Sequence, residues 1–316
     1  MKKITLATIV LLLAANMAVW HAVYTENQRK ELTVAFLDIG QGDAIFIEAP
    51  NGNQIIVDGG PNSKILHELG KLMPWYDKTI DMIVVTNPDK DHVAGFTDIL
   101  KRYKVSYLIE SGTQNKSLIH NTVQELAREK GVEKVTARRG MEIFLDEESD
   151  NQVVLTVLFP DKDVSKEKPN DGSIVMRLKY GETEVMLMGD APISVEKHIL
   201  SFTEAKLGAR SDIAATGPKE SNARSGQELL DTELESDILK IGHHGSKTST
   251  SEEFVRAVNP SYAVISSGKE NKYGHPHEET LVTLAKFSQF PLKILRTDEA
   301  GTIVMKSDGK NFVQAK

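Results

Sequence analysis

The chain has 316 residues, of which 40% are hydrophobic and 26% are charged, the balance of a globular protein with a sizeable core. Its 38 Lys and Arg residues are outnumbered by 45 Asp and Glu residues, and the net charge of −7 argues against a broad, non-specific grip on nucleic acid. Because cysteine is absent, disulfides and thiolate metal sites are excluded, and any metal ion must have nitrogen and oxygen ligands.

The first segment, 1–24, is apolar and begins with two lysines, Lys2 and Lys3. Its uncharged part is long enough to cross a bilayer, since about 20 apolar residues suffice for a helix. We therefore predict an N-terminal hydrophobic helix, either a single-pass anchor in the cytoplasmic membrane or a cleaved signal segment. The lysines favour a cytoplasmic amino terminus, which would place the rest of the chain on the extracytoplasmic side.

A polar linker, 25–31, precedes one folded domain, 32–316. Apolar runs predict strands there, and a period of 3.6 residues predicts helices. In chain order we expect strands at 32–40, 43–50 and 54–60, a helix at 64–73, a strand at 80–86, a helix at 92–103, a strand at 105–111, a helix at 117–131 and a strand at 132–137. Further on we expect strands at 152–160, 173–181 and 183–190, a helix at 194–202, a strand at 237–242, a helix at 250–258, a strand at 262–268, a helix at 277–287, and strands at 293–297 and 301–307. Asn51-Gly52 predicts a hairpin between the second and third strands, and the polar stretch 203–237 predicts a flexible insertion.

Ionisable side chains are densest in TNPDKDHVAG, directly after the predicted buried strand at 80–86. One aspartate there could simply cap the following helix. A cap explains one carboxylate, whereas a cation site explains Asp89, Asp91 and His92 together, because carboxylate and imidazole groups are ligands for Zn, Mn or Fe.

Other polar clusters also follow predicted strands, where layered folds place their chemistry. Asp190 ends the strand at 183–190, and as an isolated residue it would be read as a turn residue. His243 and His244 stand between glycines, where one could bind metal while the other meets substrate; the alternative is a hydrogen-bonded pair in a turn. His275 is a candidate for substrate contact. No serine-nucleophile elbow, phosphate-binding loop or dinucleotide fingerprint occurs in the sequence.

Several motifs in this order resemble one known family. They are LDIGQGDAIFIEAPNGNQIIVDGGP, TNPDKDHVAG, LMGDA, LKIGHHGSKTSTSEEF, YGHPH and RTDEAGTI. Together they resemble the metallo-β-lactamase-fold domain of ComEC-type competence proteins, over about residues 32–304. The resemblance implies an α/β fold, a four-layer αββα sandwich with a metal site at one edge of its two sheets. It also implies a free-standing, membrane-tethered relative of a DNA-uptake channel.

The resemblance further implies roles for individual residues. Metal ligands would be Asp89, Asp91, His92, Asp190 and His244; Asp91, His243 and Lys247 would be catalytic, and Ser246 and His275 would contact substrate. The family signature begins with histidine where this chain has Asn87, and NDGS at 170–173 lacks another histidine of the broader fold. An amide oxygen binds a cation more weakly than imidazole, so one metal position should be weakened.

We therefore expect one or two divalent ions, Zn or Mn, with Mg also suited to an oxygen-rich site. The first functional hypothesis is a phosphodiesterase or nuclease that acts on DNA outside the cytoplasmic membrane, with a DNA-uptake channel as a possible partner. The second is a phosphoesterase that acts on a cell-envelope polymer. The third is a binding or scaffold module that has lost activity because Asn87 replaces a ligand. The sequence does not predict an oligomeric state.

Overall fold

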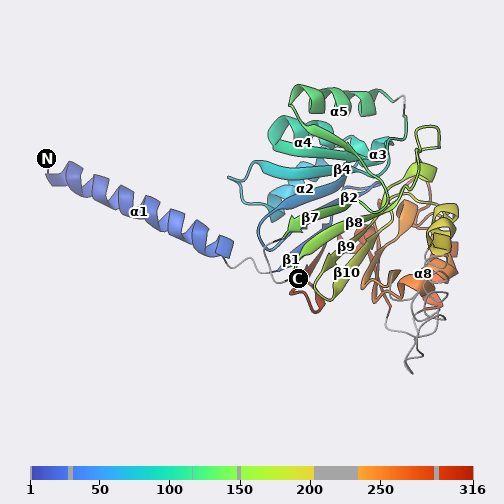
Figure 1. The fold of residues 1–316 in the computed structure, drawn as a ribbon. Coiled ribbons are helices and arrows are strands. Elements are labelled where there is room, and N and C mark those ends of the chain that lie inside the picture. The colour runs from blue at the N-terminus through green and yellow to red at the C-terminus, as the bar shows by residue number, and fades with distance from the viewer. Residues whose placement is uncertain are drawn as a thin grey trace, which may run out of the picture.

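The computed structural model describes residues 2–27, 31–115, 117–147, 151–202, 234–287 and 292–315. In it two β-sheets pack face to face, and helices cover the outer face of each sheet (Figure 1). The predicted four-layer αββα sandwich is confirmed.

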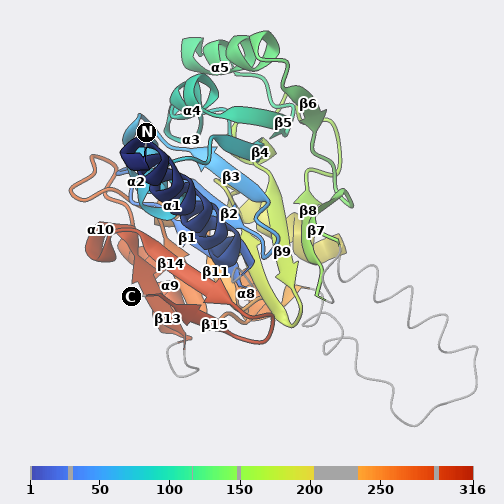
Figure 2. The same ribbon diagram turned by 90° about the vertical axis from the view of Figure 1, so that its left-hand side faces the viewer.

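The first sheet has the strand order β15-β14-β1-β2-β3-β4-β5-β6, and Figure 2 shows β1 between β14 and β2. Neighbours from β3 to β6 are parallel, and the other pairs are antiparallel. The predicted hairpin is confirmed, because Glu48 pairs with Gln54. The strands of the first sheet are β1 (Leu32–Phe36), β2 (Ala44–Glu48), β3 (Gln54–Gly59), β4 (Thr79–Val85), β5 (Lys104–Glu110), β6 (Glu133–Thr136), β14 (Ile303–Ser307) and β15 (Phe312–Gln314).

The second sheet has the order β13-β12-β11-β10-β9-β8-β7. It is antiparallel from β7 to β10 and parallel from β10 to β13. Each sheet therefore combines a meander with parallel strands. The strands of the second sheet are β7 (Glu142–Asp146), β8 (Val153–Phe159), β9 (Val175–Tyr180), β10 (Thr183–Leu187), β11 (Ile238–Lys240), β12 (Tyr262–Ile265) and β13 (Lys293–Arg296).

The alternation of side chains along each strand builds two kinds of core. In β1, Val34 and Phe36 pack between the sheets, whereas Ala35 faces the helices. Helices on the outer face of the first sheet are α2 (Lys64–Leu72), α3 (Lys90–Val93), α4 (Phe96–Arg102) and α5 (Leu118–Glu129). The outer face of the second sheet packs against residues 193–202, α8 (Glu252–Val258) and α9 (Glu278–Ala285). A one-turn helix, α10 (Thr297–Ala300), follows β13.

Three details differ from the sequence prediction. The helix expected at 92–103 is two helices, α3 and α4, with Gly95 at the junction. A Cβ at Gly95 would collide with the carbonyl oxygen of Gly59, so glycine lets this junction lie against the end of β3. Strands β7 and β15 were not predicted. Both are edge strands, and their exposed side chains interrupt the apolar runs by which strands were predicted.

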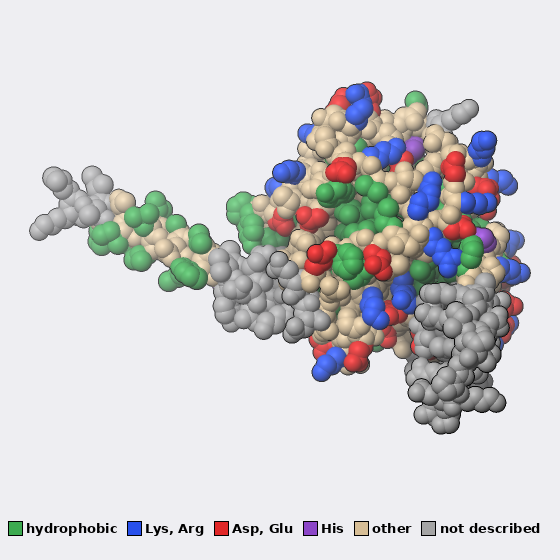
Figure 3. Space-filling model, viewed as in Figure 1, with side chains coloured by type: hydrophobic (Ala, Val, Ile, Leu, Met, Phe, Trp, Pro, Cys, Tyr) green, Lys and Arg blue, Asp and Glu red, His purple; other side chains and the backbone are tan. Residues whose placement is uncertain are grey.

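The N-terminal helix α1 (Lys2–Asn27) extends away from the folded body (Figure 1). Apolar side chains such as Leu11, Met17 and Trp20 are exposed along its described part (Figure 3). Among the residues that the structure describes, no helix is both long enough and apolar enough to cross a membrane. The anchor or signal segment expected at 1–24 stays a prediction. The insertion predicted at 203–237 lies outside the described residues except for its last positions, and so does part of the linker predicted at 25–31.

Candidate metal centre

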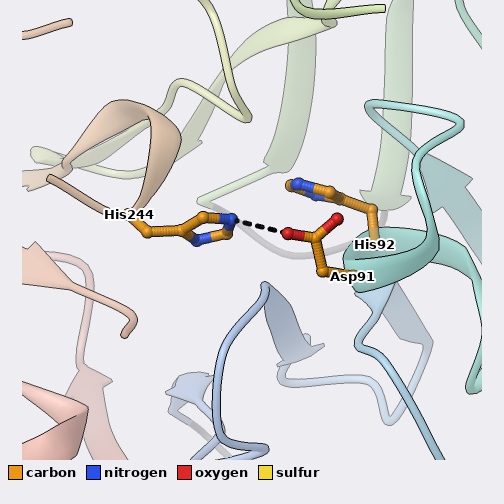
Figure 4. A group of neighbouring side chains, drawn as sticks. All are labelled: Asp91, His92 and His244. Carbon is orange, nitrogen blue, oxygen red and sulfur yellow. Dashed lines mark ion pairs between the residues drawn. The ribbon is translucent and has the colours of Figure 1, made fainter. Parts of the chain in front are cut away.

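Four candidate ligands meet at one edge of the sandwich. Asp91 and His92 follow β4, Asp190 follows β10 and His244 follows β11. The first two thus come from the first sheet and the last two from the second. Figure 4 shows Asp91, His92 and His244 directed toward a common point. Clusters that follow separate strands in the sequence are therefore brought together by the packing of the two sheets.

The distances between these side chains suit candidate ligands of a divalent cation. His244 Nε2 lies 3.4 Å from Asp91 Oδ2 and 3.6 Å from Asp190 Oδ1, and His92 Nε2 lies 3.1 Å from Asp190 Oδ2. Yet three of these buried atoms make no aligned hydrogen bond within the described chain: His92 Nε2, His244 Nε2 and Asp190 Oδ1. Buried polar atoms are rarely left without a partner. Polar atoms that approach one another without aligned hydrogen bonds are arranged as ligands are around an ion.

His92 is held by a carboxylate behind it. Its Nδ1 donates to Asp58 Oδ2 at 2.8 Å, which leaves Nε2 free to face the cluster. Asp58 also accepts hydrogen bonds from the Thr86 backbone N–H at 2.8 Å and from Thr86 Oγ1 at 2.5 Å. Asp58 has a φ of 59°, a left-handed conformation that aspartate and asparagine tolerate better than most residues.

His244 is held in a similar way. Its Nδ1 lies 3.2 Å from the Ser266 carbonyl oxygen and 3.4 Å from Asp43 Oδ1. Asp43 in turn pairs with Lys240, whose Nζ lies 2.8 Å from Oδ1 and 2.9 Å from Oδ2. Sequence reasoning assigned no role to Asp43, Asp58 or Lys240. The two aspartates could have been found, since GQGD and VDGG both follow predicted strands; Lys240 gave no signal beyond a charge in an apolar strand.

The charges of the cluster are strongly coupled. Burial would lower the pKa of His92, but Asp190 and Asp58 raise it well above its ordinary value. Burial likewise opposes the charge of His244, yet Asp190 and Asp43 raise its pKa to about 9. Burial would raise the pKa of Asp190, but His92 and His244 hold it far below the usual range. Protons on two histidines thus supply positive charge that a divalent cation would replace.

Asn87 and Asp89 are placed differently from these four ligands. Asn87 Oδ1 accepts the backbone N–H of Asp89 at 3.0 Å, and its Nδ2 donates to Asn170 Oδ1 at 2.8 Å. Asn87 Nδ2 also lies 3.4 Å from Asp190 Oδ2. Asp89 is the N-cap residue of α3, and its Oδ1 accepts a hydrogen bond from Asn115 at 2.8 Å.

Two of the remaining predicted residues line the cluster. His243 Nε2 lies 3.9 Å from Asp190 Oδ2, and its Nδ1 lies 3.1 Å from Thr248 Oγ1. The His275 ring lies 5.6 Å from that of His243 and 6.0 Å from that of His244, between ring centroids. Burial, His244 and His243 together lower the pKa of His275 to about 4. Both histidines are partly exposed, so both can meet a substrate.

The other two predicted residues have contacts outside the group of four ligands. Ser246 is buried, and its Oγ lies 3.0 Å from Thr248 Oγ1. Lys247 is exposed and lines a separate hollow with Glu252, Glu253 and other residues. In the described part of the chain, its side chain makes no ion pair with any carboxylate of the cluster.

Comparison with known proteins identifies the fold family. The profile of the metallo-beta-lactamase superfamily matches residues 37–269, which include all four ligands. The chain belongs to the metallo-beta-lactamase superfamily. Among solved structures, a B3 metallo-beta-lactamase with an active-site glutamic acid is 14% identical, with a TM-score of 0.39, over 80% of this chain and 86% of the other.

Curated relatives of this superfamily member carry names that are consistent with ComEC-type competence proteins. ComE operon protein 3 of Bacillus subtilis is 29% identical over 85% of this chain and 32% of its own length. Recombination protein 2 of Haemophilus influenzae is 27% identical over 79% of this chain and 26% of its own length. The chain thus spans about a third or less of these relatives.

The metallo-beta-lactamase fold implies a divalent metal ion, and the residues present fit one. Asp91, His92 and His244 form one group of candidate ligand atoms that lie within 4.8 Å of one another, and Asp43, His92 and Asp190 form a second. Both groups offer the mixed N and O set that Zn or Mn accepts. The orphaned Nε2 and Oδ1 atoms would gain a partner from an ion, and the hydrogen bonds at both Nδ1 atoms fix the orientation of the rings.

Proposed function

We propose that this chain is a metal-dependent phosphodiesterase that cleaves DNA. The observation that carries the proposal is the clustering of His92 and His244 with the carboxylates of Asp91 and Asp190, in which three buried atoms, His92 Nε2, His244 Nε2 and Asp190 Oδ1, lack a hydrogen-bond partner in the described chain. Such a cluster is suited to hydrolysis, because a bound divalent ion lowers the pKa of a water molecule toward neutrality.

DNA as substrate is supported by the relatives, one of which is named for recombination and both of which are consistent with ComEC-type competence proteins. The net charge of −7 gives the chain little non-specific affinity for nucleic acid, so recognition would depend on the site itself. A position outside the cytoplasmic membrane, and contact with a DNA-uptake channel, are supported only by the sequence pattern and by these names.

The roles of individual residues follow from their exposure. The side chain of Asp91 is 32% exposed, compared with 5% for Asp190, so Asp91 is the carboxylate that can orient an attacking water and accept its proton. The side chain of His243 is 25% exposed and lies beside Asp190, where it can donate a hydrogen bond to a phosphate oxygen. We assign this role to His243 rather than to Lys247, which lines a different hollow.

The test is cleavage of DNA by the full chain. Protein freed of ions would be incubated with single- and double-stranded DNA in Mn, Mg or Zn, beside Asp91→Asn and Asp98→Asn variants. The two variants remove the same charge, but Asp98 lies on α4 outside the cluster. We expect ion-dependent cleavage that Asp91→Asn abolishes and Asp98→Asn retains.

Two results would overturn the proposal. If folded, ion-loaded protein cleaves neither form of DNA, intrinsic nuclease activity is excluded. Hydrolysis of a small phosphodiester such as bis(p-nitrophenyl) phosphate would then indicate an envelope phosphoester as substrate, whereas its absence would indicate a binding module. Equal cleavage by Asp91→Asn would show that activity arises elsewhere.

A further inference from the structure

Two aromatic side chains are exposed together at the edge of the first sheet that lies opposite the metal centre. Trp75 and Tyr76 follow α2 and precede β4, and they are 85% and 52% exposed. Their rings meet edge to face, with 5.8 Å between the centroids. Isolated exposed apolar residues are ordinary in a folded protein, whereas neighbouring exposed aromatic rings indicate a contact surface.

The loop that carries these rings is held in place by hydrogen bonds. The N–H of Asp77 donates to the carbonyl oxygen of Pro74 at 3.0 Å, which closes a turn around the two aromatic residues. Asp77 Oδ1 accepts hydrogen bonds from the N–H and Oγ1 of Thr79, and its Oδ2 accepts one from Gln54 Nε2 at 2.9 Å. Asp81 accepts the backbone N–H of Gln54 at 2.7 Å. The two carboxylates that follow the rings are thus engaged by groups of the protein itself.

Four exposed cationic side chains lie at the same edge. Lys78 follows the aromatic pair, and its carbonyl oxygen accepts the backbone N–H of Lys104 at 2.8 Å, where β4 and β5 begin side by side. Lys101 and Arg102 end α4 and complement the negative end of that helix, a role that Lys78 and Lys104 do not have. Within the described part of the chain, none of the four forms an ion pair. We call the following six residues the edge patch: Trp75, Tyr76, Lys78, Lys101, Arg102 and Lys104.

The chain enters the folded body at the edge that carries this patch. Thr33 of β1 pairs with Glu48, and Glu48 pairs with Gln54, whose side chain bonds the loop of the edge patch. Only residues 28–31 separate α1 from β1, and so short a segment spans at most about 18 Å. Figure 3 shows hydrophobic side chains on the side of the body from which α1 extends. The exposed apolar side chains of α1 are therefore tethered to this edge.

The metal centre lies at the other end of the same strands. The edge patch lies where β4 begins, whereas Asp91 and His92 follow the end of β4. A strand of seven residues is about 23 Å long. A flat surface in contact with the edge patch would thus leave the centre open to solvent.

We propose that the edge patch contacts a lipid bilayer with anionic headgroups. Tryptophan and tyrosine favour the interface between membrane and water, and lysine and arginine are attracted to anionic lipids. Aromatic and basic residues also bind nucleic acid. Lipid is favoured here because apolar side chains of α1, such as Leu11 and Met17, are tethered to the same edge and the candidate catalytic centre lies at the other. The contact would hold the folded body in one orientation, with the centre directed away from the membrane.

The two tryptophans of the chain allow a direct test, because one lies in α1 and the other in the edge patch. In the full chain, Trp20→Phe leaves Trp75 as the sole indole, and Trp75→Phe leaves Trp20. Each variant would be mixed with vesicles of phosphatidylglycerol and phosphatidylcholine whose acyl chains carry bromine, which quenches the fluorescence of nearby indoles. Vesicles of phosphatidylcholine alone provide a neutral surface.

We expect anionic vesicles to shift the emission of Trp75 to shorter wavelength and to quench it, and neutral vesicles or high salt to reduce both effects. Lys101→Gln with Arg102→Gln, made in the Trp20→Phe chain, should lower the ratio of quenched to unquenched Trp75 about thirtyfold at a fixed lipid concentration. Each cation near an anionic surface contributes a factor of about five.

The matched control is Lys269→Gln with Lys272→Gln, also made in the Trp20→Phe chain. It removes the same charge from exposed positions after β12, at the edge of the second sheet where the metal centre lies. This pair of substitutions should change the ratio little, because these lysines would face away from the bilayer.

Quenching of Trp20 without quenching of Trp75 would show that α1 contacts lipid while the folded body does not, and would overturn the proposal. So would equal losses in the two pairs of Gln variants, or equal quenching of Trp75 by neutral and anionic vesicles. A response of Trp75 to single-stranded DNA but not to vesicles would also overturn it and would indicate a nucleic-acid surface. None of these measurements requires cleavage of DNA, so their outcome is independent of the proposed function.

Discussion

Lys240 Nζ lies within 2.9 Å of both carboxylate oxygens of Asp43, and both side chains are almost fully buried. This pair joins β11 of the second sheet to the loop that precedes β2 of the first. It also places Asp43 beside His244 Nδ1. A structural ion pair thus supports one ligand of the candidate metal centre.

Removing one partner of this ion pair should lower the stability of the folded protein. Lys240→Met would leave the Asp43 carboxylate buried with His244 as its remaining charged neighbour, and we expect the free energy of unfolding to fall by about 3 kcal/mol. Denaturant unfolding of ion-free protein measures this free energy. The double variant Asp43→Asn with Lys240→Met removes both charges and should recover part of the loss. If the double variant is no more stable than Lys240→Met, the buried charge is not the cause.

The carboxylate behind His92 should control ion affinity. Asp58→Asn keeps an acceptor for the Thr86 N–H and tolerates the positive φ, but its amide would donate to His92 Nδ1 and move the ring proton to Nε2. We expect a loss of about 10–100-fold in ion affinity. Competition with a chelating dye measures it, with Asp98→Asn as control. Equal affinities in the two variants would contradict this role for Asp58.

Protonation of His275 should make stability depend on pH. Its pKa is about 4 in the folded protein and 6.5 when unperturbed, so between these values the unfolded chain binds the additional proton. The contribution of His275 to stability is therefore complete above pH 6.5 and is lost as the pH falls toward 4. Chemical unfolding of ion-free protein should show a steeper decline for the wild type than for His275→Gln. Parallel curves would refute this prediction.

Two glycines provide a matched test of packing. Gly95→Ala would drive a Cβ into the Gly59 carbonyl oxygen, and we expect destabilisation of about 1–3 kcal/mol. Gly70, which is exposed in α2, has open space around its missing Cβ, so Gly70→Ala should stabilise by about 0.5–1 kcal/mol. Thermal unfolding of both variants measures the contrast. Similar shifts in the two would show that the junction of α3 and α4 can adjust.

Much of the architecture could be predicted because its signals are local. Apolar runs identified most strands, and polar clusters directly after them identified Asp91, His92, Asp190 and His244, since strand ends of a layered fold meet at one edge. The Asn51-Gly52 dipeptide marked the hairpin for a similar reason.

What could not be predicted depends on contacts between distant segments. No local pattern shows that Lys240 meets Asp43, or that Asn87 meets Asn170 across the two sheets. Nor does spacing show which way a side chain points. His243 and His244 both have a positive φ, and Lys247, three residues further, faces a different hollow. The break at Gly95 depends on the nearby carbonyl oxygen of Gly59.

The four candidate ligands are divided equally between the two sheets. An ion bound by them would cross-link the two sheets at this edge of the sandwich. Disulfides do this in many secreted domains, but this chain contains no cysteine. The enclosed loop, from His92 to His244, is on the order of 150 residues, a length for which a cross-link is expected to restrict the unfolded chain strongly. Removal of the ion should therefore expose the loops at this edge to proteases before the buried strands are reached.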